Sequence, residues 1–206
     1  MKIYDCFMFS DEKMLLDIRL NVLNDYVDQF VIIESKYKHN GDIKNKNFDI
    51  NQYSQFKNKI KYIYLDEEPE GLVSISAEDD EDKKNKSILH NTYVRENYQR
   101  DVIAKGILDA GPEDFIIVGD IDEIPNLKNL NFENKKNHLI IFRQKMFYYK
   151  LNLYYKELVW TGTRACLRKN LKSPQWLRNV KNKKYPIWRI DTLFAKNKYS
   201  NIIFIN

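Results

Sequence analysis

Two aspartates, Asp120 and Asp122, stand two residues apart directly after the apolar run Phe115–Gly119. A continuous run of this kind is typical of a parallel strand that is covered on both faces. Ligands of open α/β sheets bind outside the carboxyl ends of the strands, so both carboxylates are expected at a ligand-binding edge. Paired carboxylates there can hold Mg²⁺ together with substrate phosphates, and Mn²⁺ also accepts oxygen ligands.

We therefore predict a divalent metal site on Asp120 and Asp122, where the metal would stabilise a diphosphate as a leaving group. Glu123, Ile124 and Pro125 follow the pair and fix a turn behind it, which favours this interpretation. The alternative is that both aspartates only end the strand, because a bare Asp-x-Asp is common and paired carboxylates point to function only in some proteins.

A second group of polar residues lies on a helix predicted over residues 87–110. Arg95 and Gln99 share one face of this helix, and Glu96 and Arg100 share another, because each pair is four residues apart. An arginine fork suits phosphate, so Arg100 could reach an anionic ligand at the strand end. The alternative is a solvated helix surface with Glu96–Arg100 pairing, and spacing alone favours that alternative.

Two more carboxylates are expected near the same edge of the sheet. Asp5 lies inside the first predicted strand and Glu34 ends the second. Asp5 can also be a satisfied polar group on the sheet face. Aromatic residues are dense between positions 142 and 191, and aromatic faces beside polar groups suit stacking on sugar rings or bases, although a well-filled core explains most of them.

The elements that would position these residues alternate along the chain. Strands are expected at residues 3–9, 29–34, 61–65, 115–119, 139–142 and 146–153. A first helix is expected after the capping acceptors Ser10 and Asp11, and its apolar face comprises Met14, Leu15, Ile18 and Val22. Strands that alternate with helices predict an α/β fold with a mainly parallel sheet, and residues 1–206 show neither an internal repeat nor a domain boundary.

Composition excludes several classes of protein. The chain has 206 residues, of which 43% are hydrophobic, and a net charge of +5. Its lysines are scattered, whereas nucleic-acid binders cluster theirs, so no nucleic acid is expected. There is neither a run of about 18 apolar residues that could span a membrane nor a signal peptide. Cys6 and Cys166 predict buried thiols, and the expected location is the cytoplasm.

Four motifs occur in a fixed order: Asp5-Cys6-Phe7, Val31–Ser35, Arg95-Glu96 with Gln99-Arg100, and Val118–Pro125. The segments Trp160–Arg164 and Pro174–Arg178 follow them. In this order the motifs resemble glycosyltransferase family 17, a family of bisecting N-acetylglucosaminyltransferases and their bacterial and viral relatives. The resemblance extends from Ile3 to about Asp191, and the order and spacing make it specific.

The resemblance implies a GT-A-like fold in which residues 1–125 bind a nucleotide sugar and residues 126–206 form an acceptor-side half. It implies a UDP-sugar donor, UDP-N-acetylglucosamine or a relative, and a divalent metal, Mn²⁺ or Mg²⁺. The reaction would invert the anomeric carbon while a hydroxyl of a glycan or glycoside attacks.

The resemblance also implies roles for individual residues. The donor-binding residues would be Glu34, Arg95, Gln99, Arg100, Asp120, Ile121 and Asp122, with the metal on Asp120 and Asp122. The residues on the side of the sugar or acceptor would be Trp160, Gly162, Thr163 and Arg164. The catalytic base stays open among Asp191, Glu157 and Glu123, because a base must lie within hydrogen-bond reach of the acceptor hydroxyl.

Two departures from the family pattern lead to further expectations. Family members continue past the position of Asn206 through a Gly-Gly-Trp-His-Phe-type segment, so we expect a C-terminally truncated chain. Its last strand would be an exposed edge that pairs with a partner chain or with the missing segment. Golgi members carry an N-terminal membrane anchor that is missing here, so a glycoprotein acceptor in a secretory lumen is not expected.

Two other functions remain open. An apolar strand that leads into Asp-x-Asp also fits a phosphohydrolase with Asp120 as its nucleophile, although such a motif is expected near the N-terminus. The third possibility is a truncated, inactive module that binds a sugar nucleotide without transferring the sugar.

Overall fold

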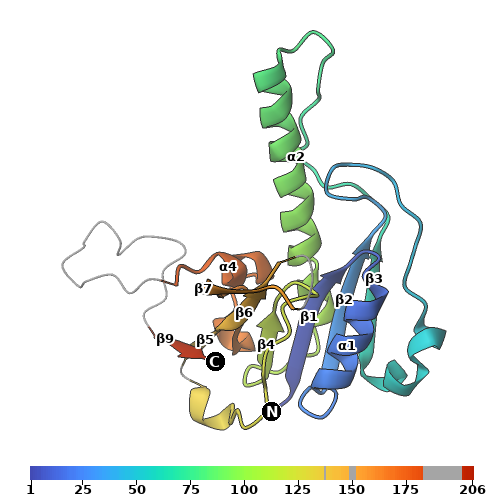
Figure 1. Ribbon diagram of the computed structural model, residues 1–206. Coiled ribbons are helices and arrows are strands. Elements are labelled where there is room, and N and C mark those ends of the chain that lie inside the picture. Colours follow the sequence, from blue (N-terminus) through green and yellow to red (C-terminus); the bar gives the residue numbers. More distant parts are fainter. Residues whose placement is uncertain (137, 149–151, 183–200) are drawn as a thin grey trace.

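The computed structural model describes residues 1–136, 138–148, 152–182 and 201–206 (Figure 1). Its strands are β1 Ile3–Phe9, β2 Gln29–Ser35, β3 Ile60–Leu65, β4 Phe115–Val118, β5 Leu139–Phe142, β6 Gln144–Phe147, β7 Tyr154–Trp160, β8 Arg164–Leu167 and β9 Ile202–Ile205. Its helices are α1 Lys13–Leu23, α2 Glu81–Asp101, α3 Ile103–Gly106 and α4 Pro174–Asn179, with 3₁₀ helices η1 Ile50–Lys59, η2 Glu133–Lys135 and η3 Arg168–Asn170.

Seven of these strands form one sheet in the order β3-β2-β1-β4-β8-β5-β9. β1 pairs in parallel with both β2 and β4, and β2 pairs in parallel with β3. β8 is antiparallel to its neighbours β4 and β5, and β9 is parallel to β5 at the edge. The predicted α/β domain with a mainly parallel sheet is therefore confirmed, and strands from both halves of the chain share this sheet.

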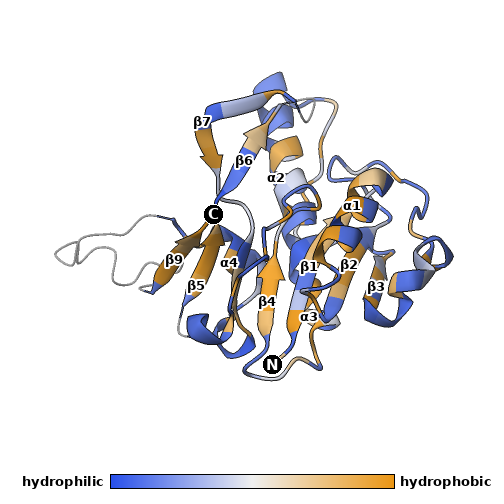
Figure 2. Ribbon diagram, turned by 60° about the horizontal axis from the view of Figure 1, so that its bottom comes forward, coloured by the Kyte–Doolittle hydropathy of each residue, from blue (hydrophilic) through white to orange (hydrophobic). Residues whose placement is uncertain are grey.

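Both faces of the sheet are covered. On one face, Leu16, Leu20 and Leu23 of α1 pack against alternate residues of β1, β2 and β4. On the other face, the residues in between pack against Ile103 of α3 and Leu177 of α4. These central strands are therefore apolar at nearly every position (Figure 2), which explains why their sequences do not alternate.

The predicted buried face of α1 was wrong. The helix buries Leu16, Arg19, Leu20 and Leu23, whereas Met14 is 68% exposed. The cause is Arg19, because a pattern of apolar residues treats arginine as a surface residue, and here it turns inward to meet an acid on β1. The predicted caps are also absent: Glu12 occupies the N-cap without a capping bond, and its carboxylate accepts from the backbone N–H groups of Ser10 and Asp11.

Helix α2 starts earlier than predicted and ends earlier. Asp80 caps it by accepting from the N–H of Lys83 at 2.7 Å, and the acidic residues Glu81 and Asp82 lie in its first turn. The N-terminal part of α2 projects beyond the sheet (Figure 1). After its end, Val102, Ile103 and Ile107 are buried, whereas Leu108 is 78% exposed.

The second half of the chain differs most from expectation. β6 and β7 form a separate two-stranded antiparallel sheet in place of the single strand predicted over 146–153, and this hairpin stands apart from the main sheet (Figure 2). β8 was missed as a strand because Arg164 and the preceding Thr-Gly-Thr do not resemble the start of a buried strand. β9 confirms the strand expected at residues 201–206.

One buried ion pair joins α1, β1 and the loop after β4. Asp5 and Arg19 are both fully buried, and the Arg19 Nη2 and Nε donate to the two Asp5 carboxylate oxygens at 2.7 and 2.8 Å. Arg19 Nη1 donates to the backbone carbonyls of Asp120, Ile121 and Glu123 at 2.7, 3.2 and 3.2 Å. Burial alone lowers the pKa of Arg19, but the charge and hydrogen bond of Asp5 outweigh it and raise that pKa overall. Asp5 is thus a satisfied polar group on the sheet face, which was the second interpretation of this residue in the sequence.

Removing this arginine should destabilise the fold strongly. Arg19→Met leaves the Asp5 carboxylate buried without its cation, so we expect a loss of about 3–5 kcal/mol in the free energy of unfolding, measured by urea denaturation. Lys169→Met is the control, because the pair between Lys169 and Glu113 is exposed and should contribute nothing measurable. Equal stability of the two variants would show that the buried pair does not hold the fold.

Candidate functional site

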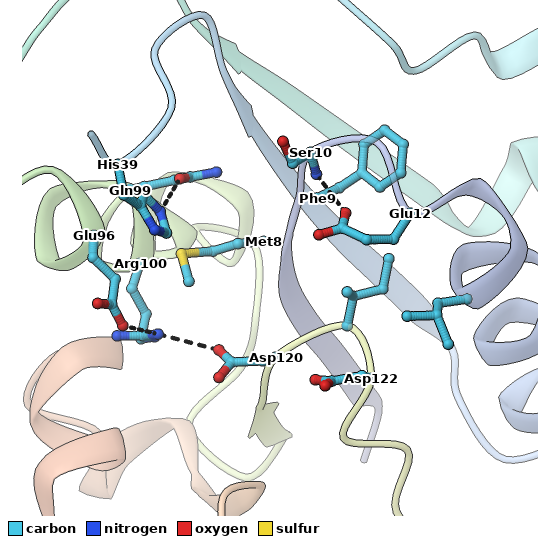
Figure 3. A pocket seen from close by; sticks show the side chains of 12 residues that line it. Met8, Phe9, Ser10, Glu12, His39, Glu96, Gln99, Arg100, Asp120 and Asp122 are labelled. Carbon is cyan, nitrogen blue, oxygen red and sulfur yellow. Dashed lines mark hydrogen bonds and ion pairs between the residues drawn. The ribbon is translucent and has the colours of Figure 1, made fainter. Parts of the chain in front are cut away.

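A cavity of about 380 Å³ opens at the carboxyl ends of β1 and β4 (Figure 3). Its lining is Met8, Phe9, Ser10, Glu12, Leu15, His39, Glu96, Gln99, Arg100, Asp120, Ile121 and Asp122. The chain runs outward from β1 through β2 to β3 and then returns to β4 on the other side of β1. The cavity therefore lies at the point where the strand order reverses, which is where open α/β sheets bind ligands.

Asp120 lies in this cavity between two arginines. Its Oδ1 accepts from Nη2 of Arg100 at 3.1 Å, and its Oδ2 accepts from Nη2 of Arg178 at 2.6 Å. Arg100 is almost fully buried and also pairs with Glu96 at 2.8 Å. Asp120 therefore joins α2 and α4 to the loop that follows β4. Arg100 reaches the strand end, as one interpretation of the helix expected, and it also forms the Glu96 pairing of the other interpretation.

Asp122 is different, because it forms no ion pair within the described residues, although it faces the same cavity (Figure 3). Its side chain remains accessible to solvent, yet enough protein surrounds it that desolvation raises the pKa of its carboxyl. The negative charges of Glu123 and Asp120 raise that pKa further. The site thus contains a carboxylate without a counter-charge, which is where a cation would be stabilised.

Glu123 is a buried structural residue, which argues against its candidacy as catalytic base. Both of its oxygens accept from Arg178 at 2.7 Å. The indole Nε1 of Trp160 adds a bond of 2.5 Å, and the N–H of Asp120 adds one of 2.9 Å. With its side chain 5% exposed and both oxygens occupied, this carboxylate is not available to take a proton from a substrate.

The segment expected on the sugar or acceptor side wraps around Glu123. A Cβ added to Gly162 would lie 1.8 Å from the Glu123 Oε1, so only glycine leaves room for this carboxylate. The hydroxyl of Thr163 donates to the Glu123 carbonyl at 2.7 Å. Gly162, Thr163 and Arg164 are buried, whereas Trp160 is exposed. These contacts make the segment a support for the loop, and contact with an acceptor stays a prediction for Trp160.

Arg164 lies inside this support and not in the cavity. Its Nη1 donates to the Leu177 carbonyl at 3.3 Å, which joins β8 to α4. Burial and then the positive charge of Arg178 lower its pKa to about 10. The arginine is therefore costly to keep charged at this position, which fits a part in holding α4 and not in binding a ligand from solvent.

Glu34, expected to bind the donor, is fully buried and does not line the cavity. Its Oε1 accepts from Nζ of Lys44 at 2.6 Å and from the N–H of Asn47 at 2.8 Å. Its Oε2 accepts from the N–H of Phe48 and the hydroxyl of Tyr62. The lone pairs of this side chain are used to hold the loop after β2, and its contact with a donor stays a prediction.

Arg95 and Gln99 both support a turn that carries His39. Gln99 lines the cavity, contacts Nε2 of His39 at 3.1 Å and donates to the Ile33 carbonyl. Arg95 does not line the cavity; it pairs with Glu68 and packs under Gly41, where an added Cβ would lie 2.9 Å from its Nη2. Gln99 thus lines the cavity itself, whereas Arg95 positions the turn.

The remaining candidates from the sequence are Ile121, Glu157 and Asp191. Ile121 lines the cavity and is otherwise buried in the core. Glu157 is exposed on β7, where its carboxylate accepts from the Tyr155 hydroxyl at 3.3 Å, and it does not line the cavity. Asp191 lies outside the described residues.

A second cavity of about 400 Å³ adjoins the first between α2 and α4. It shares Glu96 and Arg100 with the first cavity, and Arg178 contributes from the other helix. The two cavities therefore meet where Arg100 binds Asp120.

Sequence reasoning missed Arg178, Glu96 and His39 as site residues. Arg178 belongs to one of the segments that carried the family resemblance, but its partner Asp120 is 58 residues away, and nothing in the sequence identifies that pair. Glu96 was recognised only as a partner of Arg100. His39 had no signal beyond its neighbour Gly41, whose φ of 98° requires a turn there.

The described residues contain neither a three-ligand metal cluster nor a membrane-spanning helix. No three His, Cys, Asp or Glu side chains of the described ranges converge as ligands for a metal ion. None of the helices described is both long and apolar enough to cross a membrane.

The raised pKa of Asp122 predicts a stability effect. The folded state disfavours ionised Asp122, so this residue lowers the free energy of unfolding above its folded pKa, and the penalty vanishes below the unfolded value of about 4. In metal-free buffer, Asp122→Asn should raise the thermal midpoint at pH 7, and the gain should shrink as the pH falls towards 4. The exposed Asp66→Asn is the control, and a stability loss in Asp122→Asn at pH 7 would contradict the argument.

Sequence similarity to known proteins identifies the family of this chain. The sequence profile of glycosyltransferase family 17 matches residues 1–175. The β-1,4-mannosyl-glycoprotein 4-β-N-acetylglucosaminyltransferases of rat and human are each 25% identical to this chain over 128 residues, and that of mouse is 24% identical. The alignment covers 60% of this chain but 22% of each relative. Because the profile extends over most of the chain, this protein belongs to glycosyltransferase family 17.

Proposed function

We propose that this chain transfers a sugar from a nucleotide diphosphate sugar to a hydroxyl group of a glycan or glycoside. The observation that carries the proposal is the cavity between β1 and β4, in which the unpaired Asp122 lies beside Asp120 and Arg100. The names of the relatives support N-acetylglucosamine as the sugar, and hence UDP-N-acetylglucosamine as the donor. The strand order at the cavity supports the GT-A-like arrangement, with residues 1–125 supplying most of the donor site.

The residues present fit a divalent cation that is shared with the donor. Asp122 supplies a carboxylate without a counter-charge, whereas both oxygens of Asp120 already bind arginines. Mg²⁺ is typically held by one or two carboxylates plus substrate phosphates, so the absence of a third side-chain ligand among the described residues agrees with a donor-completed site. A bound Mn²⁺ or Mg²⁺ would neutralise the charge of the departing diphosphate.

Arg100 is the cation of the chain that faces the donor. It is 2% exposed, lines both cavities and bonds Glu96, Asp120 and Gln175. Among the described residues its Nε has no hydrogen-bond partner. Because Glu96 and Asp120 balance the charge of Arg100, the extra positive charge beside the diphosphate would come from the divalent cation, while Arg100 holds Asp120 in place.

We add Glu96 to the candidates for the catalytic base, of which Asp191 lies outside the described residues. Glu96 lies at the junction of the two cavities, its Oε1 binds Arg100 at 2.8 Å, and its side chain is 30% exposed. In an inverting transfer the acceptor oxygen forms a bond to the anomeric carbon while the bond to the diphosphate oxygen breaks. The diphosphate leaves with the electron pair of that bond, and the proton of the acceptor hydroxyl passes to Glu96.

The two alternatives are less well supported. A phosphohydrolase would need Asp120 as a nucleophile, but both of its oxygens are occupied by guanidinium groups. An inactive sugar-nucleotide-binding module would keep the donor site and fail in transfer, so it is distinguished by turnover and not by binding.

Metal-dependent UDP binding tests the donor site. Calorimetry should show that Mn²⁺ strengthens UDP binding to the unmodified chain, and that Asp122→Ala weakens the metal-dependent part at least about tenfold, as expected for a lost metal contact. Asp66→Ala serves as the matched exposed control. The donor site would be refuted if Mn²⁺ did not change the UDP affinity, or if Asp122→Ala left the metal-dependent affinity unchanged.

The role of Glu96 is tested by an isosteric change. Glu96→Gln should lower kcat for transfer or donor hydrolysis by about 10²–10⁴-fold, the usual contribution of a general base, while UDP affinity stays the same. The control is Glu81→Gln. Glu81 lies in the exposed first turn of the same helix, so this variant removes one negative charge from the helix without changing the cavities. A kcat near that of the unmodified chain would exclude Glu96 as the base.

A further inference from the structure

The cavity between α2 and α4 has a lining unlike that of the donor cavity. One face of α2 supplies Tyr93, Asn97 and Arg100, and one face of α4 supplies Gln175 and Asn179. These residues are three or four positions apart on each helix, so each helix presents a single polar stripe. The helices are joined at the inner end of the cavity by Arg100 Nη1 and Gln175 Oε1 at 2.6 Å.

The cations of this cavity are already neutralised. Arg100 is paired with Glu96 and Asp120, and Arg178 is paired with Asp120 and Glu123. Two guanidinium groups thus face three carboxylates. An anionic ligand would meet no uncompensated positive charge here, so the lining disfavours a phosphate or carboxylate group.

The groups that remain available are neutral. Within the described residues, neither the hydroxyl of Tyr93 nor the amide of Asn97 has a hydrogen-bond partner, and both line the cavity. Asn179 accepts from Gln175 Nε2 at 3.1 Å through its Oδ1, which leaves its NH₂ group free to donate. Tyr93 also offers an aromatic face, since its side chain is 62% exposed. Neutral amides and a hydroxyl beside an aromatic ring match the hydroxyl groups and apolar face of a sugar.

We propose that this cavity binds the acceptor as a neutral, polyhydroxylated sugar ring. The proposal rests on the proposed function, since it needs a donor in the adjoining cavity. Glu96 lies at the boundary of both cavities, so a hydroxyl of a ring held between Tyr93 and Asn179 faces the carboxylate that would take its proton. The acceptor specificity of the chain is then set by α2 and α4.

Sugar binding can be read directly by saturation-transfer NMR with UDP present. The probe is a mixture of the methyl glycosides of glucose, galactose, mannose and N-acetylglucosamine. At least one glycoside should bind to the unmodified chain. Tyr93→Ala, which removes the ring, and Asn179→Trp, which fills the cavity, should each weaken its binding at least about tenfold, the scale of one lost stacking or hydrogen-bonding contact.

The control variant is Leu89→Ala, an exposed change on the same helix, which should bind the glycoside like the unmodified chain. The absence of any glycoside binding, binding that both cavity variants leave unchanged, or displacement of the glycoside by inorganic phosphate would each overturn the proposal. UDP affinity is measured separately by calorimetry and should be the same in all variants. Loss of UDP binding with glycoside binding intact would refute the donor site, and with it the acceptor role, whereas the assignment of a sugar site to this cavity would stand.

Discussion

The site depends on the buried ion pair between Asp5 and Arg19. A strand in the middle of a sheet and a helix packed on it could lie against each other through apolar side chains alone. Here the pair also fixes their relative orientation, because one guanidinium binds the Asp5 carboxylate and the backbone carbonyls of Asp120, Ile121 and Glu123. Removing two charges from water is costly, and the hydrogen bonds to the loop offset part of that cost. The loop after β4 is therefore held at the end of β1, where the donor cavity forms.

Around this loop, charged groups far apart in the sequence neutralise one another. Arg100 comes from α2 and Arg178 from α4, and both bind Asp120, while Arg178 also binds Glu123. Each guanidinium reduces the cost of burying its carboxylates. Among the described residues, Asp122 belongs to none of these pairs. Its uncompensated negative charge suits the proposed metal ion, which would bind together with a nucleotide diphosphate. The same pairing leaves the neighbouring cavity without an unpaired cation among the described residues, which agrees with the proposed uncharged acceptor.

The segment Trp160–Arg164 shows how a family motif can be structural and functional at once. Gly162 makes room for the Glu123 carboxylate, and Thr163 binds the backbone carbonyl of the same residue. These residues therefore keep the shape of the aspartate loop. This structural part could not be read from the motif, because a sequence motif does not reveal which partner a side chain has.

The sequence by itself determined the sheet and the aspartate pair. Residues 115–118 and 30–33 are apolar throughout because both of their faces are covered, and a continuous apolar run followed by Asp-x-Asp can be recognised without coordinates. Only the tertiary structure decided which carboxylates are free. Glu34, Glu123 and Asp122 look alike in the sequence, yet four donors surround Glu34, a bidentate arginine holds Glu123, and Asp122 forms no ion pair in the described part of the chain. Those partners are brought together by long-range packing, which local spacing does not encode, and this is why Arg178 and Glu96 emerged only once α4 had been placed against α2.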